Sequence, residues 1–149
     1  MAQYTARDVA EYFLRQTDEE SGDLISNLKL QKLVYYAQCL HLAIFEKPLF
    51  DDEIVAWMHG PVVVDLYHDY KEFGGSAIVL NDLQPSNLDE KTKEFLDEVY
   101  KALGQYSAWK LRDMTHKETP WINADNKGSG SVITHSDMQE FFKQWIRTS

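Results

Sequence analysis

The feature that most constrains the fold is a broad apolar stripe that follows Ser26 and Asn27 and ends at Pro48. Apolar residues recur there every three or four positions, which is the spacing of one face of an α-helix. The stripe consists of Leu30, Leu33, Val34, Ala37, His41 and Ile44, and it is widened by Tyr36, Leu40 and Ala43. Because so wide a surface must be covered on several sides, the sequence predicts a central helix, capped by Ser26 or Asn27 and packed against several neighbours.

Further helices are predicted on both sides of the central helix, because capping residues precede segments with helical spacing. These helices cover residues 6–15, 62–73, 88–103, 107–115 and 134 onward. A short β-hairpin or small sheet is predicted from residues 49–50 and 54–58, with a further strand at 77–80. Gly60 and Pro61 are expected to end the sheet and start the next helix, and Pro120 with Trp121 to turn the chain. The expected fold class is therefore mainly α (α+β), with five to six helices around the central helix.

The chain has 149 residues, which suits one hydrophobic core, so a single domain over residues 1–149 is expected. It carries 15 basic and 24 acidic side chains, for a net charge of −9. Nucleic acids and anionic membranes both favour a basic surface, so neither is an expected partner. The acid excess either complements a basic partner surface or serves solubility.

The sequence also bears on the compartment. Cys39 is the one cysteine, so no disulfide can form within the chain, and a lone thiol suits a reducing cytoplasm. The N-terminus has neither the basic region nor the apolar run of a signal peptide, and no stretch is apolar enough to span a membrane. A cytoplasmic protein is expected, with Cys39 buried as a small apolar residue of the central helix.

A search for catalytic or metal-binding motifs finds none that is convincing. The five histidines do not form a His-Glu-x-x-His zinc pair, and His41 on the apolar stripe is interpreted as a hydrogen-bonded core residue. There is no Gly-x-Ser-x-Gly motif, and the glycines and serines of residues 127–131 lack the spacing of a phosphate-binding loop. The sequence therefore predicts no enzyme, no catalytic residue, no metal and no cofactor.

Dense clusters of aromatic, proline and charged residues stand out instead, at residues 28–38, 56–67 and 107–121. Each cluster can be explained by caps and core packing, and Trp57, Trp109 and Trp121 are each expected to bury a large area. The order of the clusters carries more information than any one of them. The informative pieces are residues 29–33 (KLQKL) and 35–38 (YYAQ), 47–50 (KPLF), 56–63 (AWxHGPVV), 66–67 (LY), 107–111 (SAWxL), 115–124 (THxExPWxxA) and 141–142 (FF).

In this order the pieces resemble the Panacea domain, the SocA-like antitoxin family of prophages and small bacterial toxin–antitoxin operons, over residues 8–145. The resemblance implies an antitoxin that neutralises a co-encoded protein toxin by direct binding. Toxins of the family are varied, so the resemblance does not identify this one. Some members carry an additional DNA-binding region for which this chain has no room, so control of an operon is not expected.

The resemblance supplies no catalytic residues, but its two most distinctive motifs contain His59 and His116. One hypothesis is that these histidines line a polar pocket or partner-contact surface in the folded chain. The other residues expected at that site are Tyr35, Trp57, Glu118 and Trp121. The alternative is that the same side chains form a buried hydrogen-bonded network that stabilises the fold.

Three other functions stay open at this stage. The chain could be an adaptor that hands a bound partner to a protease, which would need a second docking surface. It could be a small enzyme or ligand-binding protein that uses a pocket at His59 and His116. It could also be a prophage regulator that contacts DNA, although the net charge of −9 argues against this. The sequence leaves the oligomeric state undetermined.

Overall fold

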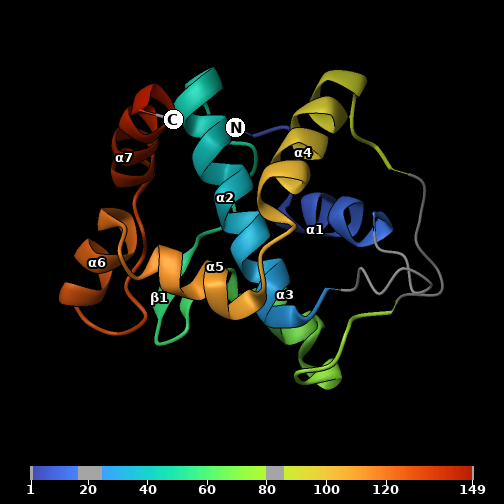
Figure 1. Ribbon diagram of the computed structural model, residues 1–149, viewed down its shortest axis with the longest axis horizontal. Coiled ribbons are helices and arrows are strands. Elements are labelled where there is room, and N and C mark those ends of the chain that lie inside the picture. The colour runs from blue at the N-terminus through green and yellow to red at the C-terminus, as the bar shows by residue number, and fades with distance from the viewer. Residues whose placement is uncertain (1, 17–24, 80–85, 149) are drawn as a thin grey trace.

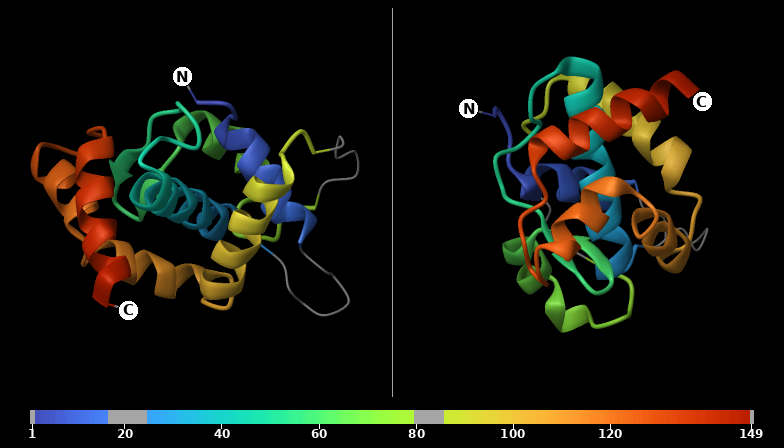
Figure 2. Two further views of the ribbon diagram at one scale, coloured as in Figure 1. Left: turned by 90° about the horizontal axis from the view of Figure 1, so that it is seen from above. Right: turned by 90° about the vertical axis from the view of Figure 1, so that its left-hand side faces the viewer.

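The central helix predicted from the apolar stripe organises the whole structure. The computed structural model describes residues 2–16, 25–79 and 86–148. Most of the acidic loop that the sequence predicts from Thr17 to Asn27 lies outside the described residues, as do residues 80–85. Helix α2 (Asn27–Phe45) is capped by Ser26, whose hydroxyl accepts a hydrogen bond from the backbone N–H of Lys29 at 3.3 Å. Most α2 residues are buried, and the other elements surround this helix (Figures 1 and 2). The prediction of a central helix is confirmed.

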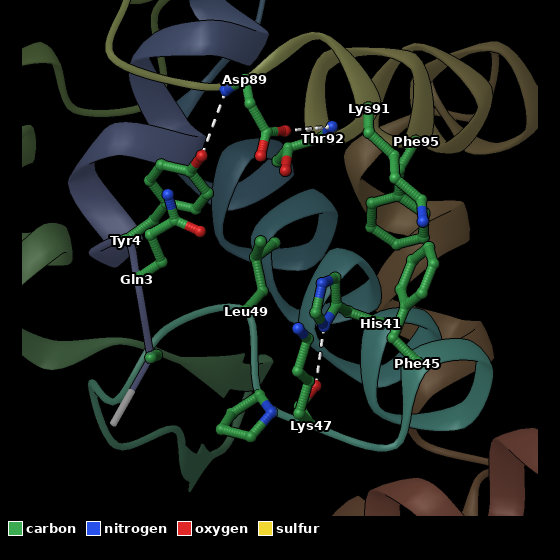
Figure 3. Close-up of a pocket in the computed structure, with 12 residues that line it drawn as sticks. Gln3, Tyr4, His41, Phe45, Lys47, Leu49, Asp89, Lys91, Thr92 and Phe95 are labelled. Atoms are coloured by element: carbon green, nitrogen blue, oxygen red, sulfur yellow. Dashed lines mark hydrogen bonds between the residues drawn. The ribbon is translucent and has the colours of Figure 1, made fainter.

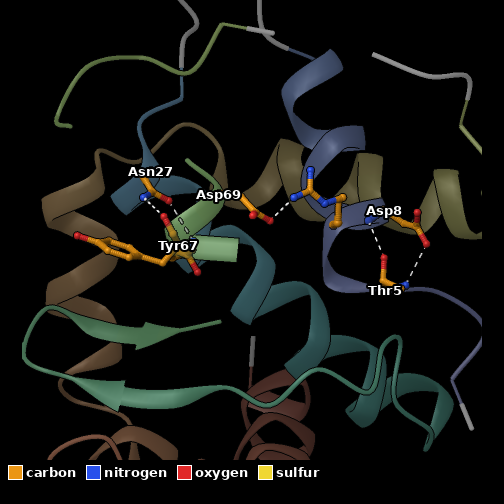
Figure 4. Close-up of polar contacts among 7 residues, drawn as sticks. Thr5, Asp8, Asn27, Tyr67 and Asp69 are labelled. Atoms are coloured by element: carbon orange, nitrogen blue, oxygen red, sulfur yellow. Dashed lines mark hydrogen bonds and ion pairs between the residues drawn. The ribbon is translucent and has the colours of Figure 1, made fainter. Parts of the chain in front are cut away.

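Helix α2 contacts α1 (Ala6–Arg15), α4 (Glu90–Leu103), α5 (Ala108–Thr115) and α7 (His135–Thr148), and also the shorter helix α3 (Val64–Asp69). The caps predicted for three of these helices, Thr5, Ser107 and Thr134, are present, and Asp89 caps α4. Each of these side chains accepts a hydrogen bond from a backbone N–H of the first turn. At α1 the Asp8 carboxylate also accepts from the backbone N–H of Thr5, which completes a capping box (Figure 4). These helices begin where the capping residues predict because side-chain oxygens satisfy their free N–H groups.

The β-hairpin is present, but its second strand differs from the prediction. Strand β1 (Val55–Trp57) pairs antiparallel with β2 (Gly60–Val62), so Gly60 and Pro61 belong to the sheet and do not start a helix. Pro61 is tolerated because a two-stranded sheet has only edge strands, where its missing N–H need not serve a neighbour. Gly60, with a φ of +111°, allows the tight return after Met58 and His59.

The segments around the hairpin differ accordingly. Residues 49–50 form no strand of this sheet, and Phe50 makes only a single bridge, to Tyr4. The helix expected over 62–73 is the shorter α3 (Val64–Asp69), which is followed by a 3-10 turn, η1 (Lys71–Phe73). The strand expected at 77–80 is reduced to one bridge between Ser26 and Ala77, and residue 80 lies outside the described chain. The prediction began a helix at Val62 and so missed β2, because Val62 and Val63 fit a strand as well as a helix.

A short helix, α6 (Thr119–Asn126), stands where Pro120 and Trp121 were expected only to turn the chain. Pro120 lies in its first turn, where a missing N–H costs nothing because that group has no helical partner. With α6 the described chain contains seven α-helices, the central α2 and six others. The fold class, mainly α with a small β-hairpin, is confirmed.

Two predictions of burial are wrong, and both concern the surface. Trp109 is 58% exposed, although a core position was expected, and Ile44 at the end of the α2 stripe is 52% exposed. Cys39, in contrast, is fully buried as expected. Among the described residues, no helix is both long enough and apolar enough to cross a membrane.

Candidate functional site

The residues singled out by the sequence motifs converge where four elements meet beside the N-terminal half of α2. The hairpin β1–β2 packs on α2, α5 packs on both α2 and β2, and α6 packs on β1. This arrangement brings the segments 56–63 and 107–121 together, although about fifty residues separate them in the chain. In Figure 1 the hairpin lies beside α5 and α6 below the middle of α2.

Trp57, His116 and Trp121 form one connected group at this junction. The indole Nε1–H of Trp121 donates to the backbone carbonyl of Trp57 at 3.0 Å. The His116 ring lies against the Trp121 ring, with 4.1 Å between centroids. Burial, together with the positive charge of Arg112, lowers the pKa of His116, so its ring is neutral at pH 7. The group fastens α6 to the hairpin through the C-terminal end of α5.

His59 belongs to a second group that lies at the surface. The Nε–H of Arg112 donates to His59 Nδ1 at 3.3 Å. The His59 ring meets the Trp109 ring edge-on, with centroids 5.7 Å apart, and the Arg112 guanidinium lies 5.3 Å from the Trp109 ring. Trp109 is thereby held from two sides while more than half of it remains exposed. A large aromatic side chain held in this way is pre-organised for a partner.

Tyr35 and Glu118 lie in the interior, on the α2 side. The Tyr36 hydroxyl donates to Glu118 Oε2 at 2.8 Å, and Glu118 Oε1 has no hydrogen-bond partner among the described residues. Burial raises the pKa of Glu118 to about 8, although the bond from Tyr36 opposes that rise. Burial also raises the pKa of the Tyr35 hydroxyl, which lies near the Cys39 thiol. At neutral pH this interior cluster therefore consists largely of neutral groups.

Lys32 is the residue that the sequence analysis missed. Its side chain is fully buried, and its Nζ donates to the backbone carbonyl of Pro61 at 3.1 Å. A β-carbon at Gly60 would lie 2.6 Å from Lys32 Cε, so the glycine makes room for the lysine. Burial, together with the charge of Arg112, lowers the pKa of Lys32 to about 7. The signal was present in the sequence: Lys32 precedes Tyr36 by four residues and Tyr35 by three, which places it on the same helical face.

An open groove of about 540 Å³ lies beside the surface group. We call it the hairpin groove, and the residues that line it are Asn27, Leu28, Gln31, Trp57, Met58, His59, Val62, Tyr67, Lys71, Gly74, Trp109 and Ser129. Two of the predicted residues, Trp57 and His59, are among them. Tyr35, His116, Glu118 and Trp121 are not.

A second cavity, of about 370 Å³, lies between the N-terminal segment, the end of α2 and the start of α4 (Figure 3). There the Nδ1–H of His41 donates to the Lys47 carbonyl at 2.7 Å, as expected of a hydrogen-bonded core histidine. The Tyr4 hydroxyl accepts from the backbone N–H of Asp89 at 3.1 Å, and Lys91 lies over the Phe45 ring. None of the residues predicted for the site lines this cavity.

The six predicted residues thus occupy three depths. His59 is exposed; Trp57, His116 and Trp121 are half-buried; Tyr35 and Glu118 are buried. The structure joins the half-buried residues by direct contacts and places Glu118 with Tyr36. His59 and His116 are related through Arg112, which bonds His59 and whose charge lowers the pKa of His116. Within the described ranges, no group of three or more His, Cys, Asp or Glu side chains is arranged to hold a metal ion.

The described chain is thus a helical fold with an aromatic groove at its surface. Residues 30–122 match the family described as antitoxin SocA-like, Panacea domain. The match covers more than half of the chain and includes all six predicted site residues, so the chain belongs to this family. Searches of curated proteins and of solved structures found no significant match.

Proposed function

We propose that this chain is an antitoxin that neutralises a co-encoded protein toxin by binding it directly, in the cytoplasm and without catalysis. Membership of the SocA-like antitoxin family is the observation that carries the proposal. The groove beside Trp109 and His59 supports it, since an exposed tryptophan held by its neighbours is typical of a protein-binding surface.

The proposal divides the six motif residues into two roles. His59, with Trp109 and Arg112, lies where a partner can reach it, so these side chains would contact the toxin. Trp57 contributes one wall of the groove, and its carbonyl is held by Trp121. Tyr35 and Glu118 are too deeply buried for contact, so they would support the surface from within.

The first test is rescue of growth. The gene next to this one should stop growth when expressed alone, and this chain supplied from a separate plasmid should restore it. The two proteins should also co-purify at a fixed ratio. Rescue without a complex would contradict direct binding and favour an enzyme or regulator instead.

Surface variants make the test specific. Trp109→Ala should weaken the complex at least tenfold and reduce rescue, because buried tryptophans dominate binding at protein interfaces. Ile44→Ala is the matched control, since Ile44 is a similarly exposed apolar residue on α2 that does not line the groove. Both variants should melt at nearly the wild-type temperature, because each removes an exposed side chain.

A protease adaptor predicts a different result. An adaptor would neutralise the toxin only where the protease is active, whereas direct binding should restore growth in a strain that lacks cytosolic proteases. Specific DNA binding is also not expected, because the chain carries a net charge of −9. Tight binding of operator DNA by the isolated chain would contradict this part of the proposal.

A further inference from the structure

The hairpin groove has a polar chemistry that differs from the rest of the chain. The chain as a whole has 24 acidic and 15 basic side chains. None of the described residues that line the groove is acidic, whereas Lys71 and His59 are both at its surface. Arg112, which adjoins His59, is paired with Asp113 at 3.2 Å. The lining of the groove thus carries one lysine and no carboxylate, on a protein that is acidic overall.

The floor of the groove contains two buried amide side chains, Asn27 and Gln31, which are hydrogen-bonded to each other and to the backbone. Gln31 Nε2 donates to Asn27 Oδ1 at 3.0 Å, and Gln31 Oε1 accepts from the backbone N–H of Val63 at 3.0 Å. Asn27 Nδ2 donates to the Tyr67 carbonyl at 3.1 Å (Figure 4). Each of these amides thus has a hydrogen bond at its oxygen and another at its nitrogen, so the floor is polar but already engaged.

The rim provides two donors. Because Arg112 can only donate, His59 Nδ1 must be the acceptor of their bond, and the ring proton of neutral His59 lies on Nε2. Nε2 is then a donor at the exposed edge of the ring. Lys71, in the 3-10 turn η1, is exposed and forms no ion pair with another described residue. The two groups at the rim without a described partner, His59 Nε2–H and the Lys71 amine, are therefore both donors, which suits the binding of carboxylates.

The walls between these donors are apolar and aromatic. Trp57 and Tyr67 meet edge-on, with centroids 5.2 Å apart, on one side, and the exposed Trp109 stands on the other. Met58, 74% exposed, lies in the turn between the strands. A volume of about 540 Å³ is within the range of sites that bind small ligands or a few side chains, and methionine with aromatic residues forms an adaptable apolar surface.

We infer that the hairpin groove binds an extended segment of the toxin in which apolar side chains stand next to aspartate or glutamate. The apolar side chains would lie between Trp57, Tyr67 and Trp109, and the carboxylates would accept from Lys71 and His59. This inference rests on the proposed antitoxin function and adds the chemistry of the partner. The net charge of the whole chain suggests a basic partner, whereas the inference expects an acidic segment at this surface.

The test uses three capped peptides that differ only in charge. The acidic probe is acetyl-Gly-Asp-Leu-Phe-Asp-Gly-amide; in the second peptide Asn replaces both Asp residues, and in the third Lys replaces them. Binding is followed by NMR on the ¹⁵N-labelled full chain, whose four tryptophans give separate indole N–H signals. The acidic peptide should shift the signals of Trp57 and Trp109 but not that of Trp145, and should bind at least threefold more tightly than the Asn peptide. The Lys peptide should bind most weakly.

Matched variants locate the binding. Lys71→Gln should remove most of the preference for the acidic peptide over the Asn peptide, because it removes the charge that recognises carboxylates. Lys110→Gln removes an equally exposed lysine that does not line the groove, and should leave the preference unchanged. Trp109→Ala should weaken all three peptides about tenfold.

The results that would overturn the inference are distinct. It fails if the three peptides bind equally, if the Lys peptide binds best, or if none shifts the Trp57 and Trp109 signals. It also fails if the wild-type chain self-associates and Trp109→Ala abolishes the association, because the occupant is then a second copy of this chain. If the toxin complex forms equally well with Lys71→Gln and Trp109→Ala, the groove inference is wrong while neutralisation stands. If wild type does not rescue growth, the antitoxin proposal fails whatever the peptides do.

Discussion

Replacing Glu118 by glutamine should change how the stability of the protein depends on pH. Burial raises the pKa of this carboxyl group to about 8 in the folded chain, against an ordinary value of 4.5. Between these two values the folded protein holds a proton that the unfolded chain has released. The stability linked to Glu118 is therefore fully present below pH 4.5 and is lost as the pH rises towards 8.

The size of this loss follows from the shift. Each pKa unit corresponds to about 1.4 kcal/mol, so wild type should lose about 3 kcal/mol of unfolding free energy between about pH 5 and pH 7.5 through this one group. Glutamine has a similar shape, can still accept the hydrogen bond from Tyr36, and does not titrate. Glu118→Gln should therefore gain about 3 kcal/mol relative to wild type over the same interval, whatever its stability at pH 5.

Urea denaturation followed by tryptophan fluorescence measures this difference at each pH. Subtracting the two curves removes the contributions of the other titrating groups, including Lys32. Glu46→Gln is the control: Glu46 is exposed and pairs with Lys143, which lowers the pKa of its carboxyl, so its difference curve should be flat above pH 5. A constant difference between wild type and Glu118→Gln from pH 5 to pH 7.5 would refute the assignment of a buried, protonated Glu118.

Four further variants test other contacts. Gly60→Ala should destabilise the fold by about 1–3 kcal/mol in urea denaturation, because φ is +111° and the new β-carbon would meet Lys32. Lys32→Met should leave stability at pH 7 unchanged or increase it in the same assay, since it removes a buried amine that has no carboxylate partner among the described residues; a large loss would contradict this. Trp121→Ala should cost about 3 kcal/mol of unfolding free energy, because its ring packs on the core and its N–H bonds the Trp57 carbonyl. His59→Gln should keep the wild-type melting temperature and weaken toxin binding in calorimetry, because the exposed imidazole orients Trp109; unchanged affinity would remove His59 from the site.

Helices that begin with a capping residue and continue with regular spacing were predicted correctly, as α2 and α7 show. Their caps and apolar faces are local patterns that the sequence displays directly. The hairpin was harder to place, because the choice of partner for residues 54–58 depends on a turn at Met58 and His59 that contains only one strong signal, Gly60. The short helix α6 was missed because Glu118 provides no side-chain cap and Pro120 was interpreted as a turn.

The site was predictable in part. The motifs identified Trp57, His116 and Trp121, which the structure brings into contact. Their depth could not be predicted, because it depends on how α5 and the hairpin pack on α2. Trp109 shows the difficulty: its residue type indicates a core position, yet the packing of α5 turns it outward. Whether the six residues form a functional surface stays a prediction for the variants above to decide.

The buried polar residues near the groove and the exposed residues at its rim have separate roles: the first hold the fold together, and the second shape the surface. Lys32 is held by the Pro61 carbonyl and by the space at Gly60, and Glu118 is held by Tyr36, so these groups connect α2 to the hairpin and to α6. Both side chains are buried, so replacing them acts on packing and stability and leaves the exposed surface of the groove unchanged. Lys71 and Met58 have no such role, because both are exposed on turns. Substitutions there can alter the charge and shape of the groove at little cost in stability, so under the proposed antitoxin function the rim is where one fold would be matched to different toxins.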